Sequence, residues 1–218
     1  DEAAKTPALR LIAFEGAGKH FSFGASVEEH VASKAGAMLA SFHGMFLKMV
    51  DLSIPTAALV RGQCLGGGME LAIFCNFLFA DQTAVFGQPE IKLAVLPPPA
   101  SLILPLKVGQ ANADEINLTG ATVTAEAARR IGLVTHLVPA GEDGWQHLSA
   151  WAGGNIVPLS GASLRRACAA SRMHFNDVLR TRFTDVEKLY LEDLMRTHDA
   201  NEGIAAFLEK RKPSWKHS

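Results

Sequence analysis

The stretch Cys64-Leu65-Gly66-Gly67-Gly68-Met69-Glu70 decides the predicted fold, because it joins a buried strand to a helix. The apolar run at 55–60 before it is typical of a buried strand, and the proline-free apolar run at 69–75 has helical length. Glycines carry no side chain, so a ligand can lie against the backbone here. Free N–H groups at the start of the helix suit a carbonyl oxygen that becomes negative during a reaction. With Glu70 one turn inside the helix, the stretch predicts part of a site.

Apolar runs on both sides of this junction predict alternating strands and helices. Strands are expected at 8–14, 55–60, 77–80, 84–86 and 133–138, and helices at about 27–50, 69–75, 100–108, 111–118 and 124–131. Ser26 followed by Glu29 forms a capping-box pattern, which places the start of the first helix at about residue 27. The methionines and phenylalanines of that helix are expected in the core rather than in a ligand pocket.

The pattern changes after about residue 140, where only helices are expected, at about 144–151, 159–171, 175–197 and 201–210. We therefore predict an α/β core over residues 1–140 and a helical C-terminal lobe over residues 141–218, packed on the core or on another subunit. The strands read as continuous apolar runs, as expected when helices cover both faces of a sheet.

Composition excludes several classes of function. The chain has 218 residues, is 48% hydrophobic and carries a formal net charge of −1, so charge does not suggest a nucleic-acid or membrane-surface partner. Three cysteines without CxxC spacing indicate reduced, buried thiols and a cytoplasmic protein. No apolar segment reaches 18 residues, and no signal-peptide pattern is present. The chain starts at Asp1 without a methionine, so we expect that it was trimmed or that further residues precede it.

Two carboxylates, Glu70 and Glu90, are candidates for acid–base chemistry. They lie twenty residues apart, each at the end of an apolar segment, and Pro89 fixes the turn before Glu90. Burial would raise their pKa values toward working pH, as a general acid and base require. The alternative is that Glu70 only favours the helix dipole and Glu90 is a surface acid.

The other polar motifs give weaker signals. The eight histidines form no HxH or HExxH pattern, so no metal site is expected. His20, in the loop before Gly24, either contacts a ligand or faces solvent. The basic run 210–212 either binds phosphate or favours the dipole at a helix end.

Several motifs in order resemble the crotonase superfamily of enoyl-CoA hydratases and isomerases. They are Phe21-Ser22-Phe23-Gly24-Ala25, Gly62-Gln63-Cys64-Leu65-Gly66-Gly67-Gly68-Met69-Glu70-Leu71-Ala72 and Phe86-Gly87-Gln88-Pro89-Glu90. Leu118-Thr119-Gly120, Gly132-Leu133-Val134, Val138-Pro139 and residues 202–211 continue the match. The resemblance implies a ClpP-like spiral of ββα units with a helical C-terminal lobe, and it suggests that the first strands and helix of the family are missing before Ala8.

The resemblance also implies roles for particular residues. Backbone N–H groups of Ala25 and Gly67 would hold the thioester carbonyl, and Glu70 and Glu90 would hold a water and shuttle its proton. Coenzyme A belongs to the substrate, so no separate cofactor is expected. The remaining residues expected to contact the acyl-CoA thioester are Lys19, His20, Phe21, Phe23, Gly24, Leu65, Gly66, Pro97, Pro98, Lys210 and Lys212.

The chain departs from the family pattern at two places. Ser26 replaces an aspartate and keeps its capping role. Pro97-Pro98-Pro99-Ala100-Ser101 replaces a glycine-rich loop, and prolines donate no backbone N–H. With Gln88-Pro89-Glu90-Ile91-Lys92-Leu93, this run is similar to cyclohexa-1,5-diene-1-carbonyl-CoA hydratases, which hydrate an alicyclic dienoyl-CoA made from benzoyl-CoA.

The resemblance therefore implies hydration of an α,β-unsaturated acyl-CoA, with an alicyclic dienoyl-CoA favoured over a straight-chain 2-enoyl-CoA. A double-bond isomerase is the alternative within the family, although isomerases often keep only one of the two acids. A non-catalytic scaffold or RNA binder is the alternative outside it, and the near-neutral charge counts against RNA. A homotrimer or a dimer of trimers is expected.

Overall fold

Four parallel strands form the larger sheet of the core. The structure is a computed structural model that describes residues 2–218. The strands lie in the order β1 (Ile12–Glu15), β2 (Thr56–Val60), β4 (Phe77–Ala80) and β7 (His136–Leu137). All five residues of β2 are buried, as the continuous apolar run predicted.

A smaller sheet beside it holds the glycine junction. Its strands are β3 (Gln63–Leu65), β5 (Val85–Gly87) and β6 (Thr122–Thr124), with β3 parallel and β6 antiparallel to β5. The sequence did not predict β3 or β6, because each has only three residues and no long apolar run. Strand β3 leads into α2 (Gly67–Phe74), so the predicted strand–turn–helix junction is present, with a short strand of its own.

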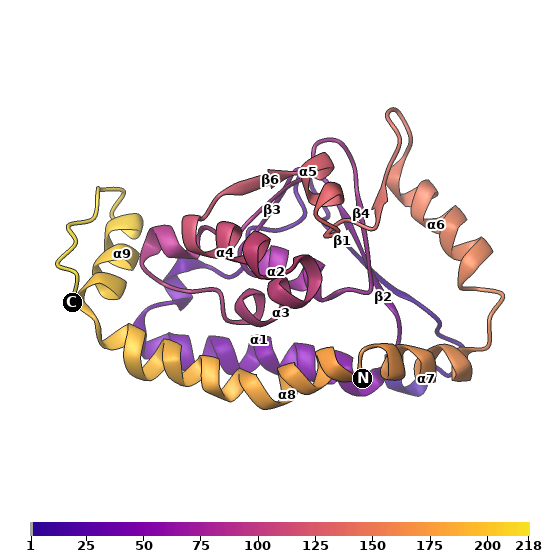
Figure 1. Ribbon diagram of the computed structural model, residues 1–218, viewed down its shortest axis with the longest axis horizontal. Helices are drawn as coiled ribbons and strands as arrows, with labels where there is room; N and C mark the ends of the chain where they lie inside the picture. The colour runs from indigo at the N-terminus through magenta and orange to yellow at the C-terminus, as the bar shows by residue number, and fades with distance from the viewer. Residues whose placement is uncertain (1) are drawn as a thin grey trace.

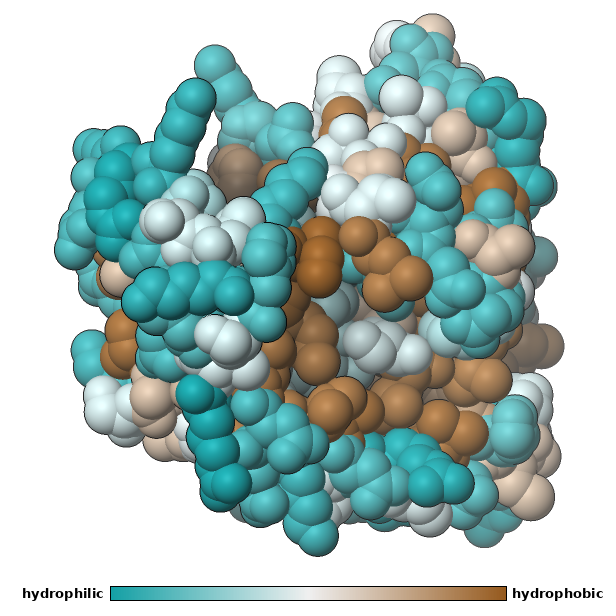
Figure 2. Space-filling view, turned by 60° about the vertical axis from the view of Figure 1, so that its left-hand side comes forward, coloured by the Kyte–Doolittle hydropathy of each residue, from teal (hydrophilic) through white to brown (hydrophobic). Residues whose placement is uncertain are grey.

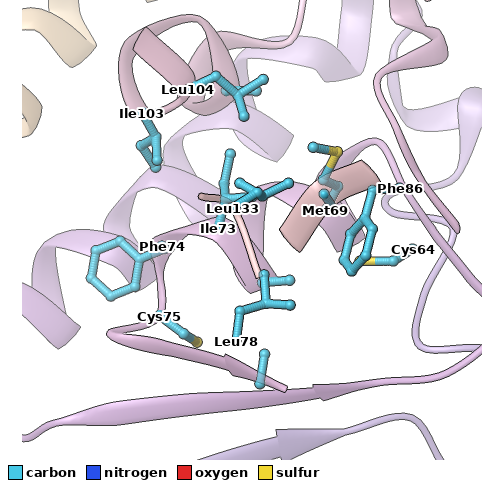
Figure 3. Packing of buried hydrophobic residues seen from close by; sticks show 14 of the residues in the cluster. Cys64, Met69, Ile73, Phe74, Cys75, Leu78, Phe86, Ile103, Leu104 and Leu133 are labelled. Carbon is cyan, nitrogen blue, oxygen red and sulfur yellow. The ribbon is translucent and has the colours of Figure 1, made fainter. Parts of the chain in front are cut away.

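The helices of the core are α1 (Ala32–Leu52), α2, α3 (Pro98–Val108), α4 (Gln110–Thr119) and α5 (Ala125–Arg130). Helices α2 and α3 lie between the strands and the long helix α1 (Figure 1). Side chains from α2 and α3 meet those of the strands in the main hydrophobic cluster, which includes Ile73, Leu78 and Leu104 (Figure 3). Burial of each such side chain stabilises the fold by about 1.5–3 kcal/mol.

From Gly144 onward the described chain contains helices and no strands. The helices are α6 (Gly144–Asn155), α7 (Gly161–Ser171), α8 (Met173–Lys188) and α9 (His198–Leu208). Helix α8 lies along α1, and α9 contacts the segment 89–93 of the core (Figure 1). The predicted α/β fold with a helical C-terminal lobe is confirmed, whereas the division into two domains at residue 140 stays a prediction.

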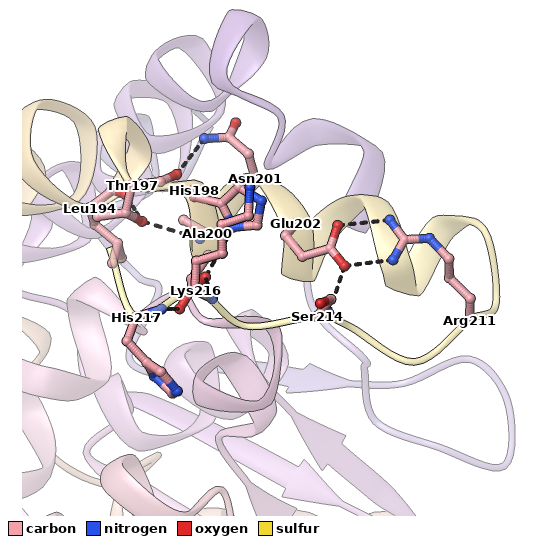
Figure 4. Close-up of polar contacts among 11 residues, drawn as sticks. Leu194, Thr197, His198, Ala200, Asn201, Glu202, Arg211, Ser214, Lys216 and His217 are labelled. Atoms are coloured by element: carbon pink, nitrogen blue, oxygen red, sulfur yellow. Dashed lines mark hydrogen bonds and ion pairs between the residues drawn. The ribbon is translucent and has the colours of Figure 1, made fainter.

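The C-terminal tail folds back on α9 (Figure 4). Arg211 donates to both carboxylate oxygens of Glu202, at 2.6 and 2.8 Å. The backbone N–H groups of Lys216 and His217 donate to Asp199 at 2.7 and 2.8 Å. Two acids of one helix therefore hold the tail.

Three expected boundaries were wrong for identifiable reasons. Ser26 does cap a turn, but that turn is a 3-10 helix over Val27–Glu29, and the extended backbone of Val31 delays α1 until Ala32. The expected long helix 175–197 ends at Lys188, where a π-helical turn, Leu189–Asp193, follows. The expected strand at 8–14 is paired only from Ile12.

The proline run does not precede a helix but begins one. Pro98 and Pro99 occupy the first turn of α3, where a missing N–H leaves no hydrogen bond unmade. The helix therefore starts two residues earlier than expected.

Candidate active site

A largely apolar cavity opens beside the glycine junction, with a volume of about 620 Å³ when its open mouth is included. One face of the molecule is hollowed, with apolar side chains gathered in the hollow between hydrophilic ones (Figure 2). Apart from three polar side chains, the residues lining the cavity are apolar or glycine: Phe23, Ala25, Val27, Met38, Leu39, Phe42, Gly66, Gly67, Pro89, Leu93, Val95, Leu96, Pro97 and Pro98. The three polar side chains are those of His30, Glu70 and Glu90.

Two backbone N–H groups meet at this cavity because the loop 22–25 is docked on strand β3. Leu65 N–H donates to the carbonyl of Ser22 at 2.9 Å, and Gly24 N–H donates to Ser22 Oγ at 3.1 Å. Gly24 has φ +87°, and a Cβ there would lie 2.6 Å from the nitrogen of Gly67, so only glycine permits this approach.

The N–H groups in question belong to Ala25 and Gly67. A Cβ built on Gly67 would lie 3.5 Å from the nitrogen of Ala25, so the two groups are neighbours. Gly67 is the first residue of α2, where helix geometry leaves its N–H without an internal partner. Neither group donates to an acceptor within residues 2–218. Two free donors side by side suit one oxygen atom that gains negative charge.

The carboxyl group of Glu70 is buried in this cavity, with 4% of the residue exposed. Burial raises the pKa of Glu70 well above its usual value, and the charge of Glu90 raises it further. One hydrogen bond opposes these effects: Ala100 N–H donates to Glu70 Oε1 at 3.0 Å. The proline run leaves this N–H as the first donor of α3. Glu70 therefore keeps its proton to a higher pH than an exposed glutamate does.

Glu90 shares the cavity and has a similar electrostatic environment. Burial raises its pKa to about 7. Gly66 has φ +54°, and a Cβ there would lie 2.7 Å from Glu90 Oε1, so glycine is needed for the carboxyl group to approach the junction. With both pKa values raised, the two carboxyl groups are suited to act as a general acid and a general base.

Comparison with known proteins gives the family of the chain. The family model for enoyl-CoA hydratase/isomerase matches residues 1–218. The chain belongs to the enoyl-CoA hydratase/isomerase family. A cyclohexa-1,5-dienecarbonyl-CoA hydratase from Thauera aromatica is 44% identical over 216 residues, covering 99% of this chain and 83% of the relative. A probable enoyl-CoA hydratase, echA8, from Mycobacterium bovis is 38% identical and covers 97% of this chain and 82% of the relative.

Solved structures confirm the crotonase fold. A carnitinyl-CoA hydratase from Mycobacterium avium superposes with a TM-score of 0.83 at 28% identity, covering 100% of this chain and 85% of that chain. The relatives are named as hydratases, so the predicted enzyme class, an enoyl-CoA hydratase-type hydro-lyase, is confirmed.

Of the residues that the family resemblance implicated, the structure brings eight to the cavity. They are Phe23, Ala25, Gly66, Gly67, Glu70, Glu90, Pro97 and Pro98. Gly24 lies in an adjoining groove that Ala25 and Gly67 also border. The roles of these residues in binding and catalysis stay predictions.

The other implicated residues lie outside the cavity of this chain. Phe21 is buried in the core, and Leu65 pairs with Gly87 in the smaller sheet. His20 Nδ1 accepts a hydrogen bond from Gln63 N–H at 3.0 Å, which anchors the loop. Lys19, Lys210 and Lys212 are exposed, and their contacts with coenzyme A stay predictions.

Sequence reasoning missed the residues that support the two acids. Gln88 is fully buried, and with its amide nitrogen oriented toward Glu90 it donates to Oε2 and Oε1 at 3.0 and 3.2 Å. Its place two residues before Glu90 was the available signal.

Within residues 2–218, His, Cys, Asp and Glu side chains do not gather in groups of three that would hold a metal ion. No helix in this range is both long enough and apolar enough to cross a membrane.

Proposed function

We propose that the chain hydrates an α,β-unsaturated acyl-CoA thioester, with an alicyclic dienoyl-CoA such as cyclohexa-1,5-diene-1-carbonyl-CoA as the favoured substrate. The observation that carries this proposal is the pair of buried carboxyl groups facing an apolar cavity that also holds two free N–H donors. The Thauera aromatica relative and the proline run support the alicyclic substrate.

The proposed mechanism assigns a step to each group. The N–H groups of Ala25 and Gly67 bind the thioester oxygen. One glutamate, as the carboxylate, takes a proton from water while the water oxygen bonds to the β-carbon, and the two donors stabilise the resulting enolate. A carboxylic acid of the pair then gives a proton to the α-carbon, so that one water is added across the double bond.

Glutamine at either acid tests the mechanism. Glu70→Gln and Glu90→Gln each remove proton transfer but keep an isosteric polar side chain. Each is expected to lower the hydration rate by about 10²-fold or more, since general acid–base catalysis contributes about 10²–10⁴-fold. Binding of an unreactive acyl-CoA should stay within a fewfold of wild type. Two measurements test this: the hydration rate with a panel of alicyclic and straight-chain enoyl-CoA esters, and a binding titration with the unreactive acyl-CoA. Full activity in either variant removes that residue from the mechanism.

The same panel decides between the candidate reactions. A 2-enoyl-CoA is the second candidate substrate, because the Mycobacterium bovis relative is named a probable enoyl-CoA hydratase. Incorporation of ¹⁸O from labelled water separates hydration from double-bond isomerisation, which adds no oxygen. The presence of both Glu70 and Glu90 favours hydration.

The assembly and surroundings of the enzyme belong to the same proposal. We expect the CoA moiety to run along the loop 19–25 and near Leu65. We also expect a homotrimer or a dimer of trimers, in which Lys210 and Lys212 reach the CoA phosphates at a neighbouring site. We also expect a cytoplasmic location and no nucleic-acid partner, because the charge is balanced and the cysteines have no disulfide or metal spacing.

A further inference from the structure

His30 is the one polar side chain of the cavity lining, within residues 2–218, that the proposed mechanism does not use. It follows the 3-10 turn Val27–Glu29, and its Nδ1 lies 2.9 Å from the hydroxyl oxygen of Tyr190. Tyr190 is fully buried and belongs to the π-helical turn after α8. Single π-helical turns occur frequently at functional sites.

The hydrogen bond with Tyr190 fixes which nitrogen of His30 carries the proton. Nδ1 of His30 is the only partner of the Tyr190 hydroxyl in the described chain. A buried hydroxyl must donate to an acceptor, so Tyr190 donates to Nδ1. Burial lowers the pKa of His30, so the ring is neutral at pH 7. The single ring proton of His30 is then on Nε2, which becomes a donor.

Nε2 of His30 is free to meet a ligand. It makes no hydrogen bond within residues 2–218, and it is not among the buried polar atoms left without a partner there. The neutral ring therefore offers one unused N–H on a side chain that lines the cavity.

His30 lines the cavity that the acyl group would enter. Val27, Met38, Leu93 and Leu96 line the cavity and also pack against the hydrophobic cluster around Tyr190. Ala25 and Gly67 line the same cavity. If their N–H groups hold the thioester, the acyl group lies in this cavity, where His30 is the polar side chain besides the two glutamates.

We propose that His30, oriented by Tyr190, is a specificity-determining residue that donates from Nε2 to an oxygen substituent on the acyl group. The inference rests on the proposed function and deepens it: the site favours hydroxyacyl thioesters over unsubstituted ones. The oxygen has two possible sources, since it is either carried by the substrate or added to the ring by hydration. Tyr190 acts as a positioning residue, because it selects the tautomer without facing the ligand.

The test compares three CoA thioesters by equilibrium titration. The probes are cyclohexane-1-carbonyl-CoA and its 2-hydroxy and 4-hydroxy derivatives. All variants are made in a Glu70→Gln background, so that no bound thioester is turned over. The 2-hydroxyl lies where hydration would add oxygen to the β-carbon, whereas a 4-hydroxyl arrives with the substrate. We expect at least one hydroxylated probe to bind about fivefold to tenfold more tightly than the unsubstituted one, as one net hydrogen bond provides.

The variants separate a hydrogen bond from a general structural effect. The quantity compared is the ratio of the affinity for a hydroxylated probe to the affinity for the unsubstituted probe. His30→Phe should bring this ratio close to one while leaving the affinity for the unsubstituted probe within twofold of that of the parent protein. Tyr190→Phe should lower the ratio severalfold, and His30→Gln, which keeps a donor, should restore part of it. His147→Phe, at a histidine paired with Glu142 outside the cavity, is the matched control and should keep the full ratio.

Two results overturn the inference: equal affinity of the parent for all three probes, or an unchanged ratio in His30→Phe. A fall in affinity for all probes alike in Tyr190→Phe overturns the positioning role. The proposed function is tested separately, because it fails only when no enoyl-CoA is hydrated, and the titrations need no turnover. Hydration without a preference for hydroxylated probes therefore overturns this inference alone.

Discussion

At the scale of single residues, the structure buries two carboxyl groups, which suits acid–base chemistry but lowers the stability of the fold when they ionise. Glu70 and Glu90 both have raised pKa values, chiefly because burial disfavours their charge. A carboxyl group whose folded pKa lies above its unfolded value stabilises the fold below the unfolded pKa, near 4.5. That contribution is lost as pH rises through the folded pKa, which is about 7 for Glu90. The acid pair therefore costs stability at and above neutral pH.

Glu70→Gln tests this cost directly. The amide cannot ionise, and its oxygen can still accept the hydrogen bond from Ala100 N–H. We expect the variant to be more stable than wild type at pH 8, with a Tm higher by a few degrees, and to gain less at pH 5. Thermal unfolding at both pH values is the measurement. Glu126→Gln, at an exposed acid of α5, is the control and should change the two Tm values equally. A Glu70→Gln gain that is no larger at pH 8 than at pH 5 contradicts the argument.

At the scale of elements, the junction between β3 and α2 depends on close contact with the loop 22–25. A Cβ at Gly68 would lie 2.6–2.8 Å from the side chain and backbone of Ser22. We expect Gly68→Ala to destabilise the protein by about 1–3 kcal/mol, as overpacking typically does, and to lower activity because the N–H groups of Ala25 and Gly67 separate.

Denaturant unfolding and hydration kinetics measure the two effects. Gly18→Ala is the control, since a Cβ at Gly18 has no atom within 4 Å, and it should unfold like wild type. Unchanged stability and rate in Gly68→Ala would show that the loop moves freely against α2.

The same elements show what the sequence can and cannot predict. Strands β2 and β4 and helix α2 were predictable because continuous apolar runs and the glycine punctuation mark them. Strands β3 and β6 were not, because three-residue strands carry no periodicity and are formed by pairing with β5.

The candidate site was predictable to a similar extent. Its acids and N–H donors lie in recognisable motifs, so their residues could be named before their geometry was known. The hydrogen bond between His30 and Tyr190 joins residues 160 positions apart, and no local pattern connects them. The donation from Ala100 to Glu70 likewise depends on how α3 begins.

At the scale of the whole molecule, the C-terminal lobe supports the segment that carries Glu90. Helix α9 packs on the 3-10 helix Pro89–Leu93, and Gly203 faces this segment without room for a side chain. A Cβ there would overlap the backbone carbonyl of Leu93 and lie 3.1 Å from the ring of Trp215 in the tail. The contact therefore joins the core, the last helix and the tail that Glu202 and Asp199 hold in place.

Gly203→Ala should displace the segment 89–93 and with it the carboxyl group of Glu90. Because a misplacement of about 1 Å can cost about 10²-fold in rate, we expect a fall in kcat of at least tenfold together with a Tm lower by several degrees. Gly153→Ala, in α6 of the same lobe, is the matched control: its Cβ has no atom within 4 Å, so it should raise stability by about 0.5–1 kcal/mol at unchanged kcat. A Gly203→Ala protein that loses stability at full kcat would show that the lobe stabilises the fold without positioning Glu90.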